Sequence, residues 1–273
     1  MKTKLPLIIL STLTLFSCMN KKEDQTLEAT ANVEKQEVIH QEENAHWTYE
    51  GETGPAHWAE IEKESSCDGN RQSPINIIDI DVEDDASLLP LDIHYSANVK
   101  IHEITNNGHT IQYNFEKGDF ITLNEDTYEL IQIHFHEPSE HTINGIRYPL
   151  EMHLVHIGKN NTIAVFGIMA QEGESSEPFT ELEKYLPINN GETKVIDTDF
   201  DLTKNLPEDK GYYTYRGSLT TPPCTENVTW FVFKNPITIS VDQVKQLQQL
   251  MPLNNYRDEQ PINDRVVKQY GSR

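Results

Sequence analysis

The sequence is poor in cysteine and in basic residues. It holds 3 cysteines among 273 residues, and its 22 Lys and Arg are outnumbered by 44 Asp and Glu, which gives a formal net charge of −22. A chain this acidic repels phosphate backbones, and no Lys- or Arg-rich cluster offsets the charge locally, so we predict no nucleic-acid partner. The 36% of apolar residues is nevertheless enough for a core.

Long hydrophobic runs are also lacking. The apolar stretch from Leu5 to Phe16 is shorter than the roughly 20 residues of a membrane-spanning helix, and two lysines precede it, as in a secretion signal. It ends at Cys18 in a sequence that resembles the cleavage box of bacterial lipoproteins. We therefore predict a lipoprotein signal peptide over residues 1–17 and lipidation of Cys18. An ordinary signal peptide with an incidental cysteine is the alternative.

The predicted lipid anchors the exported chain to a bacterial membrane. Met19, which follows Cys18, is not an aspartate of the kind that retains lipoproteins at the inner membrane, so the outer membrane is favoured, at its periplasmic face or at the cell surface. Residues 18–45 lack aromatics, glycine and proline and are rich in charge, which predicts a lipidated, disordered polar tether. The composition then becomes aromatic-rich without a second linker, so we predict one domain over residues 46–273.

Lipidation of Cys18 leaves one pair of cysteines, Cys67 and Cys224. In an oxidising compartment these two can bridge, and closing a loop of roughly 150 residues stabilises a fold by about 5 kcal/mol on the chain-entropy argument. Two unrelated thiols are the alternative.

Short runs rich in β-branched and aromatic residues predict a β-dominated domain. The predicted strands are HTIQYNFE from His109, YELIQIHFH from Tyr128, EMHLVHI from Glu151, TIAVFGIMA from Thr162 and TWFVF from Thr229. Two helices are predicted, in SSEPFTELEKYL near Ser175 and in SVDQVKQLQQLM from Ser240. In the second helix, Ser240 and Gln243 form a capping-box pattern.

The densest chemical signal is QIHFHEPSEH, residues 132–141. On a strand, side chains two apart share a face, so Gln132, His134 and His136 point one way. The same rule places Glu151 and His153 on one face of the next predicted strand. Each of these two strands carries a hydrogen-bond acceptor two residues before a histidine, as metal-bound imidazoles require. We therefore predict a metal site of His134, His136 and His153.

The sequence resembles the α-class carbonic anhydrases from Trp47 to about Arg265. The resemblance implies an α+β, β-dominated single domain built on a large central, mostly antiparallel sheet with peripheral helices. The motifs, in the order of that family, are WTYEGETGPAHW (47–58), RQSPINI (71–77), NNGHT (106–110), QIHFHEPSEHT (132–142), EMHLVH (151–156), GSLTTPPCTENVTW (217–230) and NNYR (254–257).

The resemblance implies a zinc enzyme that converts CO2 and water reversibly into bicarbonate and a proton. The three histidines would hold one Zn²⁺ per chain and leave a fourth position open, as a catalytic zinc requires. Gln132 and Glu151 match the partners of His134 and His153 in that family. The acceptor for His136, which the family takes from backbone, cannot be identified from the sequence.

Further roles follow from the same resemblance. Thr220 matches the threonine that accepts a hydrogen bond from the zinc-bound hydroxide and donates its own proton to Glu140, which aims the nucleophile. His109 matches the proton shuttle, a role to which histidine is suited because its ordinary pKa lies near the working pH. Positions that organise water between shuttle and metal are matched by Tyr49, Asn107 and Gln112, the last in place of an asparagine common in animal members.

The resemblance also implies an apolar substrate pocket, whose positions are matched by Val155, Val165, Leu219, Thr221 and Trp230.

The pair Cys67 and Cys224 matches a disulfide of many secreted members of the family. Such members are often homodimers, but the sequence identifies no interface. Two other interpretations stay open: a non-catalytic module of this family that binds a partner, and a cupin-type metal enzyme. A cupin would use the glutamate of HFHEPSE, Glu140, as a ligand to iron or manganese.

Overall fold

The computed structural model describes residues 46–271. The predicted signal peptide, Cys18 and the predicted tether lie outside these residues. The described residues form strands that the structure places at β1 (Asn76–Ile77), β2 (Glu83–Asp84), β3 (Asp92–His94), β4 (Val99–Asn106), β5 (Ile111–Phe115), β6 (Phe120–Leu123), β7 (Asp126–His136), β8 (Thr142–Ile143), β9 (Ile146–Arg147), β10 (Leu150–Ile157), β11 (Ile163–Glu172), β12 (Thr193–Phe200), β13 (Tyr212–Ser218), β14 (Glu226–Phe233), β15 (Ile237–Ile239) and β16 (Lys268–Tyr270).

Helices are few and short. The α-helices are α1 (Trp58–Ile61), α2 (Glu177–Glu183) and α3 (Val241–Gln248), and the 3-10 helices are η1 (Gly51–Thr53), η2 (Pro55–His57), η3 (Asp79–Asp81), η4 (Lys159–Asn161) and η5 (Leu202–Asn205). The capping box of α3 is present as predicted, because the Ser240 side chain accepts from the Gln243 backbone and Gln243 reaches back to the Ser240 N–H. The predicted helix near Ser175 is also present, but it ends at Glu183, before Pro187.

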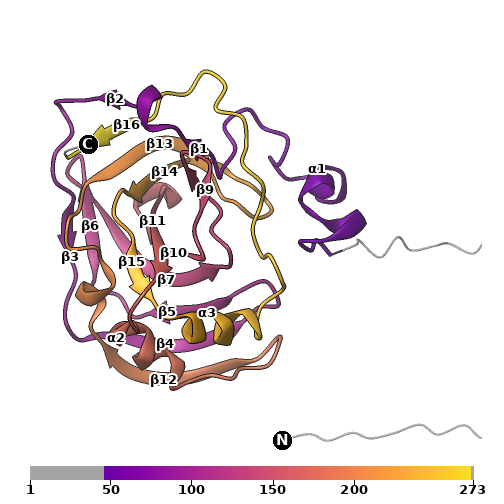
Figure 1. Ribbon diagram of the computed structural model, residues 1–273, viewed down its shortest axis with the longest axis vertical. Helices are drawn as coiled ribbons and strands as arrows, with labels where there is room; N and C mark the ends of the chain where they lie inside the picture. Colours follow the sequence, from indigo (N-terminus) through magenta and orange to yellow (C-terminus); the bar gives the residue numbers. More distant parts are fainter. Residues whose placement is uncertain (1–45, 272–273) are drawn as a thin grey trace, which may run out of the picture. The chain divides into compact units, whose positions relative to one another are not determined.

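Most strands join one large sheet in the order β12-β4-β5-β7-β10-β11-β14-β13-β16-β2, with β15, β3 and β6 paired off this path (Figure 1). Neighbours are antiparallel except for β11 with β14, β11 with β15, and β16 with β2. The predicted fold is therefore confirmed: a β-dominated domain on a large, mostly antiparallel sheet. All five predicted strands are present, as β5, β7, β10, β11 and β14.

The two faces of the sheet bury different cores. On β7, Ile133 and Phe135 point into the larger core, which also holds Met152 and Leu154 of β10. The opposite face of β10 and β11 packs a smaller apolar cluster that includes Val165 and Trp230. His134, His136 and His153 alternate with the first set, so strand periodicity places all three on the face of the smaller cluster.

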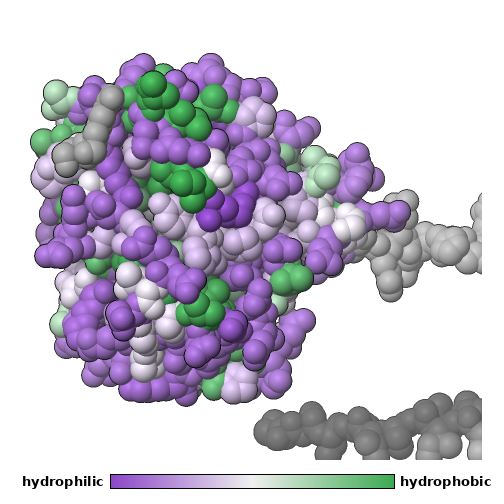
Figure 2. All heavy atoms as spheres, viewed as in Figure 1, coloured by the Kyte–Doolittle hydropathy of each residue, from purple (hydrophilic) through white to green (hydrophobic). Residues whose placement is uncertain are grey.

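A disulfide ties the N-terminal part of the domain to the loop that follows β13. Cys67 and Cys224 are bonded across 157 residues of sequence, which confirms the predicted pair. Both are buried beside Trp58. No helix of the described part of the chain is long and apolar enough to span a membrane. The face seen in Figure 2 is mostly hydrophilic, with small apolar patches between the polar side chains.

Candidate metal centre

Two antiparallel strands bring three imidazoles together. β7 and β10 pair so that His153 lies opposite His134 and Glu151 lies opposite His136. One nitrogen of each imidazole, from His134, His136 and His153, lies within 4.8 Å of those of the other two. His153 Nδ1 is 3.3 Å from His134 Nε2, so the nitrogens face one another without an intervening side chain.

The second nitrogen of each ring has an acceptor. His134 Nδ1 lies 2.9 Å from Gln132 Oε1, and His153 Nε2 lies 2.9 Å from Glu151 Oε1. His136 Nδ1 lies 2.7 Å from the backbone carbonyl of Asn255, in the NNYR motif. An acceptor at one nitrogen fixes the proton there, so the lone pair of the other nitrogen is directed to the common centre.

The electrostatics of the cluster also suit a metal. Burial holds the pKa of all three histidines below the ordinary value of 6.5, to about 4 for His136, so they are neutral at pH 7. The buried Nε2 of His136 makes no hydrogen bond in the described structure and lies 3.4 Å from Glu140 Oε2. A buried polar nitrogen without a partner is costly unless something else occupies it. The donor set, three neutral imidazoles, suits zinc.

Glu151 joins the histidine cluster to a second buried network. Its Oε1 also lies 2.8 Å from His141 Nδ1, and the other nitrogen of His141 lies 2.7 Å from the Tyr215 hydroxyl. Tyr215 in turn contacts Ser73 Oγ at 2.8 Å. Although burial raises the pKa of Glu151, the facing imidazoles hold it well below its usual range. The carboxylate is therefore ionised and fixed in place.

Glu140 lies beside the three imidazoles, beyond the end of β7. The structure places it in the bend that follows the cis Glu137–Pro138 bond. Its Oε1 accepts from the Arg257 backbone N–H at 3.0 Å. Burial raises the pKa of Glu140 to about 7, although the His153 imidazole and the Thr220 side chain oppose the rise. The structure thus brings Thr220 and Glu140 together.

An apolar wall flanks the cluster on the same face of the sheet. Val155 on β10, Val165 on β11 and Trp230 on β14 are successive partners in the register of three adjacent strands. Leu219 packs against the same apolar cluster. The Trp230 ring lies 4.9 Å from the His153 ring. Adjacent in register on one face, these side chains form a continuous apolar surface beside the imidazoles.

Thr221 lies in the turn beside this wall. Its carbonyl accepts from the backbone N–H of Cys224 at 2.8 Å, so the turn that carries Thr220 and Thr221 is held to the disulfide.

The residues predicted to handle protons lie in and beside a turn after β4. Asn107 Oδ1 accepts from the backbone N–H groups of His109 and Thr110, so its oxygen closes the turn. The Gln112 amide is hydrogen-bonded to Asn114. Tyr49 is buried near Glu140, and burial and this carboxylate raise the pKa of its hydroxyl well above 10.0.

His109 itself faces the N-terminal segment of the domain. Its ring stacks on Trp47 with centroids 3.6 Å apart, and its Nε2 lies 2.9 Å from His46 Nε2. Burial and, to a smaller extent, the neighbouring His46 imidazole lower the pKa of His109 to about 4.

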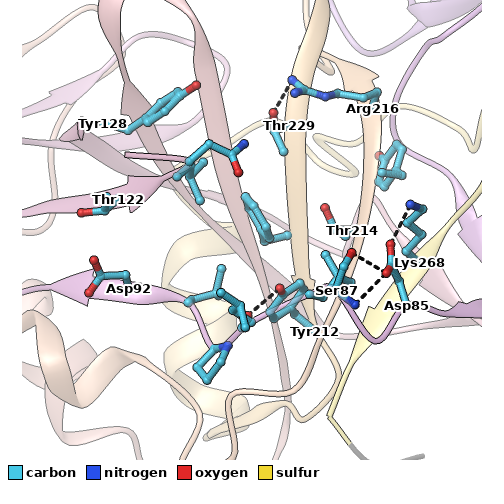
Figure 3. Close-up of a pocket in the computed structure, with 18 of the residues that line it drawn as sticks. Asp85, Ser87, Asp92, Thr122, Tyr128, Tyr212, Thr214, Arg216, Thr229 and Lys268 are labelled. Carbon is cyan, nitrogen blue, oxygen red and sulfur yellow. Dashed lines mark hydrogen bonds and ion pairs between the residues drawn. The ribbon is translucent and has the colours of Figure 1, made fainter. Parts of the chain in front are cut away.

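A separate cavity of about 600 Å³ opens on the opposite face of β13 and β14 (Figure 3). Its polar side chains bond one another: Lys268 pairs with Asp85, and Arg216 bonds Thr229. No residue of the predicted site lines this cavity.

Three contacts with predicted site residues were not identified from the sequence. The Asn255 carbonyl, the Arg257 backbone N–H and the His46 ring all contact predicted site residues. The first two lie in NNYR, a motif that marked the family but had no assigned role. No sequence signal identified the pairing of His46 with His109, because the two are 63 residues apart.

Known proteins match the described domain over nearly its whole length. The profile of the eukaryotic-type carbonic anhydrase family matches residues 53–271. A carbonic anhydrase of Klebsiella pneumoniae is 41% identical over 227 residues, which cover 82% of this chain and 90% of that protein. The solved α-carbonic anhydrase of Thermovibrio ammonificans, in complex with the inhibitor sulfanilamide, is 39% identical with a TM-score of 0.78 and covers 82% of this chain and 98% of that one.

A further solved structure carries a different title. Dioscorin, crystallised as a complex with ascorbate, is 32% identical with a TM-score of 0.77, and the match covers 84% of this chain and 99% of that one. The same fold is therefore found in a protein whose structure was determined with an organic ligand.

Proposed function

Because the chain belongs to the eukaryotic-type carbonic anhydrase family and is itself a carbonic anhydrase, we propose that it hydrates CO2 reversibly with one zinc ion held by His134, His136 and His153. The observation that carries this proposal is the set of three imidazoles that face one another while each has its second nitrogen committed to an acceptor. When bound at such a site, zinc acidifies water to a pKa of roughly 7, as is established for carbonic anhydrases, and so supplies hydroxide at neutral pH.

The chain's own residues then orient and isolate the reactants. We assign Thr220 to donate its hydroxyl proton to Glu140, whose pKa this side chain lowers. With its proton committed, the hydroxyl can only accept toward the reaction centre. A nucleophile held at this point must donate a hydrogen bond to the Thr220 hydroxyl. That bond directs the lone pair of the nucleophile toward the carbon of CO2.

CO2 is apolar and carries no group for a charged side chain to recognise. The wall of Val155, Val165, Leu219 and Trp230 provides a water-poor surface next to the three histidines. We assign the substrate to this wall, with Thr221 at its edge.

Turnover also requires that one proton leave the site in each cycle. His109 is the group assigned to carry it, with Tyr49, Asn107 and Gln112 around the water path. A neutral imidazole accepts a proton at one nitrogen and releases one to buffer.

A stopped-flow measurement of CO2 hydration tests the proposal. The sample is a chain beginning near Glu43, with its zinc content measured and with His134→Ala as the control. We expect hydration that tracks zinc content and is lost in the variant. A folded, zinc-loaded chain without hydration would instead support the non-catalytic binding module. The cupin alternative is excluded, because the chain belongs to a different family.

We also infer that the chain is exported and anchored by a lipid on Cys18, through the tether of residues 18–45, to the bacterial outer membrane. The disulfide supports export, because such bridges persist in oxidising compartments. Labelling with radioactive palmitate in a bacterial host tests the anchor: the intact chain should incorporate label and Cys18→Ala should not. Sedimentation of the soluble domain tests the homodimer that the family resemblance leaves open.

A further inference from the structure

His46 makes a direct contact with the assigned proton carrier. The two Nε2 atoms of His46 and His109 lie 2.9 Å apart, and their ring centroids lie 5.0 Å apart. At this distance one ring donates and the other accepts, so exactly one proton is shared between the two facing nitrogens. The contact crosses from the turn after β4 to the segment before η1.

The surroundings fix His109 in this pairing. Trp47 stacks on its ring at 3.6 Å with the planes 13° apart, and Asn255 Nδ2 donates to its backbone carbonyl at 2.9 Å. His46, by contrast, is exposed. The pair therefore consists of one held imidazole and one that reaches solvent.

A cavity of about 650 Å³ opens at the pair. It offers buffer molecules a place to approach both rings. The ionisable groups around the pair are Tyr49 and the Glu50 carboxylate, and the remaining lining includes Asn107, Asn190 and Leu253.

We propose that His46 is a second proton carrier, which takes the proton from His109 and delivers it to buffer. This inference rests on the proposed function, because it requires protons to leave through His109. His109 first takes up the proton released by hydration and carries one proton on each ring nitrogen. It passes its Nε2 proton to Nε2 of His46, which already holds its own proton on Nδ1 and becomes an imidazolium. His46 then loses its Nδ1 proton to a buffer base in the cavity, which leaves both rings neutral.

The low pKa of His109, about 4, agrees with this order of transfer. Burial makes the held ring a poor resting place for a proton, so the proton passes on to the exposed ring. The step needs no reactant beyond the proton from hydration and a buffer base.

The experiment compares turnover at low and high buffer in the zinc-loaded full domain. The variants are His46→Ala, His46→Gln, His109→Ala and the double variant, with His57→Ala as the matched control. His57 lies in the same segment but pairs with Glu60. We expect both His46 variants to lower kcat at low buffer by about 3- to 10-fold, to leave kcat/KM unchanged, and to recover with added imidazole. His57→Ala should behave as the parent.

The double variant tests the order of the two rings. If the rings act in series, His46→Ala/His109→Ala is no slower at low buffer than His109→Ala alone. Parent-like turnover of His46→Ala at low buffer, a loss that imidazole does not restore, or a double variant slower than both single ones would each overturn the proposal. Failure of the proposed function is distinguishable, because the parent chain would then show no hydration at any buffer concentration.

Discussion

At the scale of single residues, Glu151 orders more of the site than any of the three imidazoles. Its Oε1 serves both His153 and His141, and its Oε2 accepts from two backbone N–H groups, those of Glu140 and His141. The carboxylate thus sets the tautomer of one histidine and the path of the chain that carries Glu140. A ligand set is only as well placed as the groups that orient it.

Gly167 gives this carboxylate its room. A Cβ built at Gly167 would lie 2.8 Å from Glu151 Oε1. We expect Gly167→Ala to displace the carboxylate and to weaken zinc binding by about 10- to 100-fold. Competition with a chelator measures the change. The control is Gly211→Ala, where the nearest contact of the added Cβ is 3.4 Å. Equal zinc affinity in Gly167→Ala and the parent would contradict the expectation.

His156 contributes a pH dependence that is independent of the metal face. It is buried against Tyr95 on the other side of β10, and burial lowers its pKa from 6.5 to about 3. As the pH falls from 6.5 toward 3, the unfolded chain takes up a proton here and the folded chain does not, so the free energy of unfolding decreases. The raised pKa of Glu140 has the opposite effect on the free energy of unfolding, but this effect is the same in the parent and in a variant at His156.

We therefore expect His156→Gln to lose less stability than the parent between pH 6.5 and pH 3. Urea unfolding of zinc-free samples across this range measures the effect. His102→Gln is the control, because His102 is exposed and pairs with Asp197. Parallel curves for His156→Gln and the parent would show that burial of this imidazole does not control acid stability.

At the scale of elements, the register of β10, β11 and β14 builds the wall. Val155 pairs with Val165, and Val165 pairs with Trp230, so one row across three strands lies beside the histidines. Because side chains alternate along a strand, a shift of one residue in either pairing would turn this row to the opposite face.

Val155 is only partly buried, so a larger side chain can be placed there with limited disturbance of the core. Val155→Phe is expected to fill the apolar space, to lower kcat/KM for CO2 hydration by about 10-fold or more, and to keep zinc bound. Val195→Phe, at an exposed position on β12, is the control. Stopped-flow rates and zinc content test this prediction. An unchanged rate in Val155→Phe would show that Val155 does not line the substrate site.

At the scale of the whole molecule, the disulfide connects the N-terminal part of the domain to the loop that follows β13. Cys67 precedes the first strand, and Cys224 follows the turn of Thr220 and Thr221. The backbone N–H of Cys224 donates to the carbonyl of Thr221. Arg257 adds to this tie, since it donates from Nη2 to the Cys67 carbonyl and from its backbone to Glu140. Stability and the position of the turn that carries Thr220 are therefore linked.

Reduction of the disulfide should lower both the stability and the activity of the domain. Opening a loop of 157 residues removes up to about 5 kcal/mol from the free energy of unfolding on the chain-entropy argument. Hydration and thermal unfolding measured with and without a reductant test this. The double variant Cys67→Ser/Cys224→Ser is the control and should be insensitive to reductant. Full activity after complete reduction would show that the disulfide is not needed to position the turn of Thr220 and Thr221.

Local spacing in the sequence determined the β-dominated character of the fold and the cluster of three histidines, because both depend on alternation along strands; the other site residues were assigned by resemblance to the family. Alternation along YELIQIHFH and EMHLVHI places histidines on one face, and the acceptor two residues before a histidine identifies Gln132 and Glu151. Only the tertiary structure decided which distant groups complete these patterns. The Asn255 carbonyl reaches His136 across 119 residues and His46 reaches His109 across 63. Such contacts depend on how strands and loops pack, and the local pattern of the sequence does not contain that information.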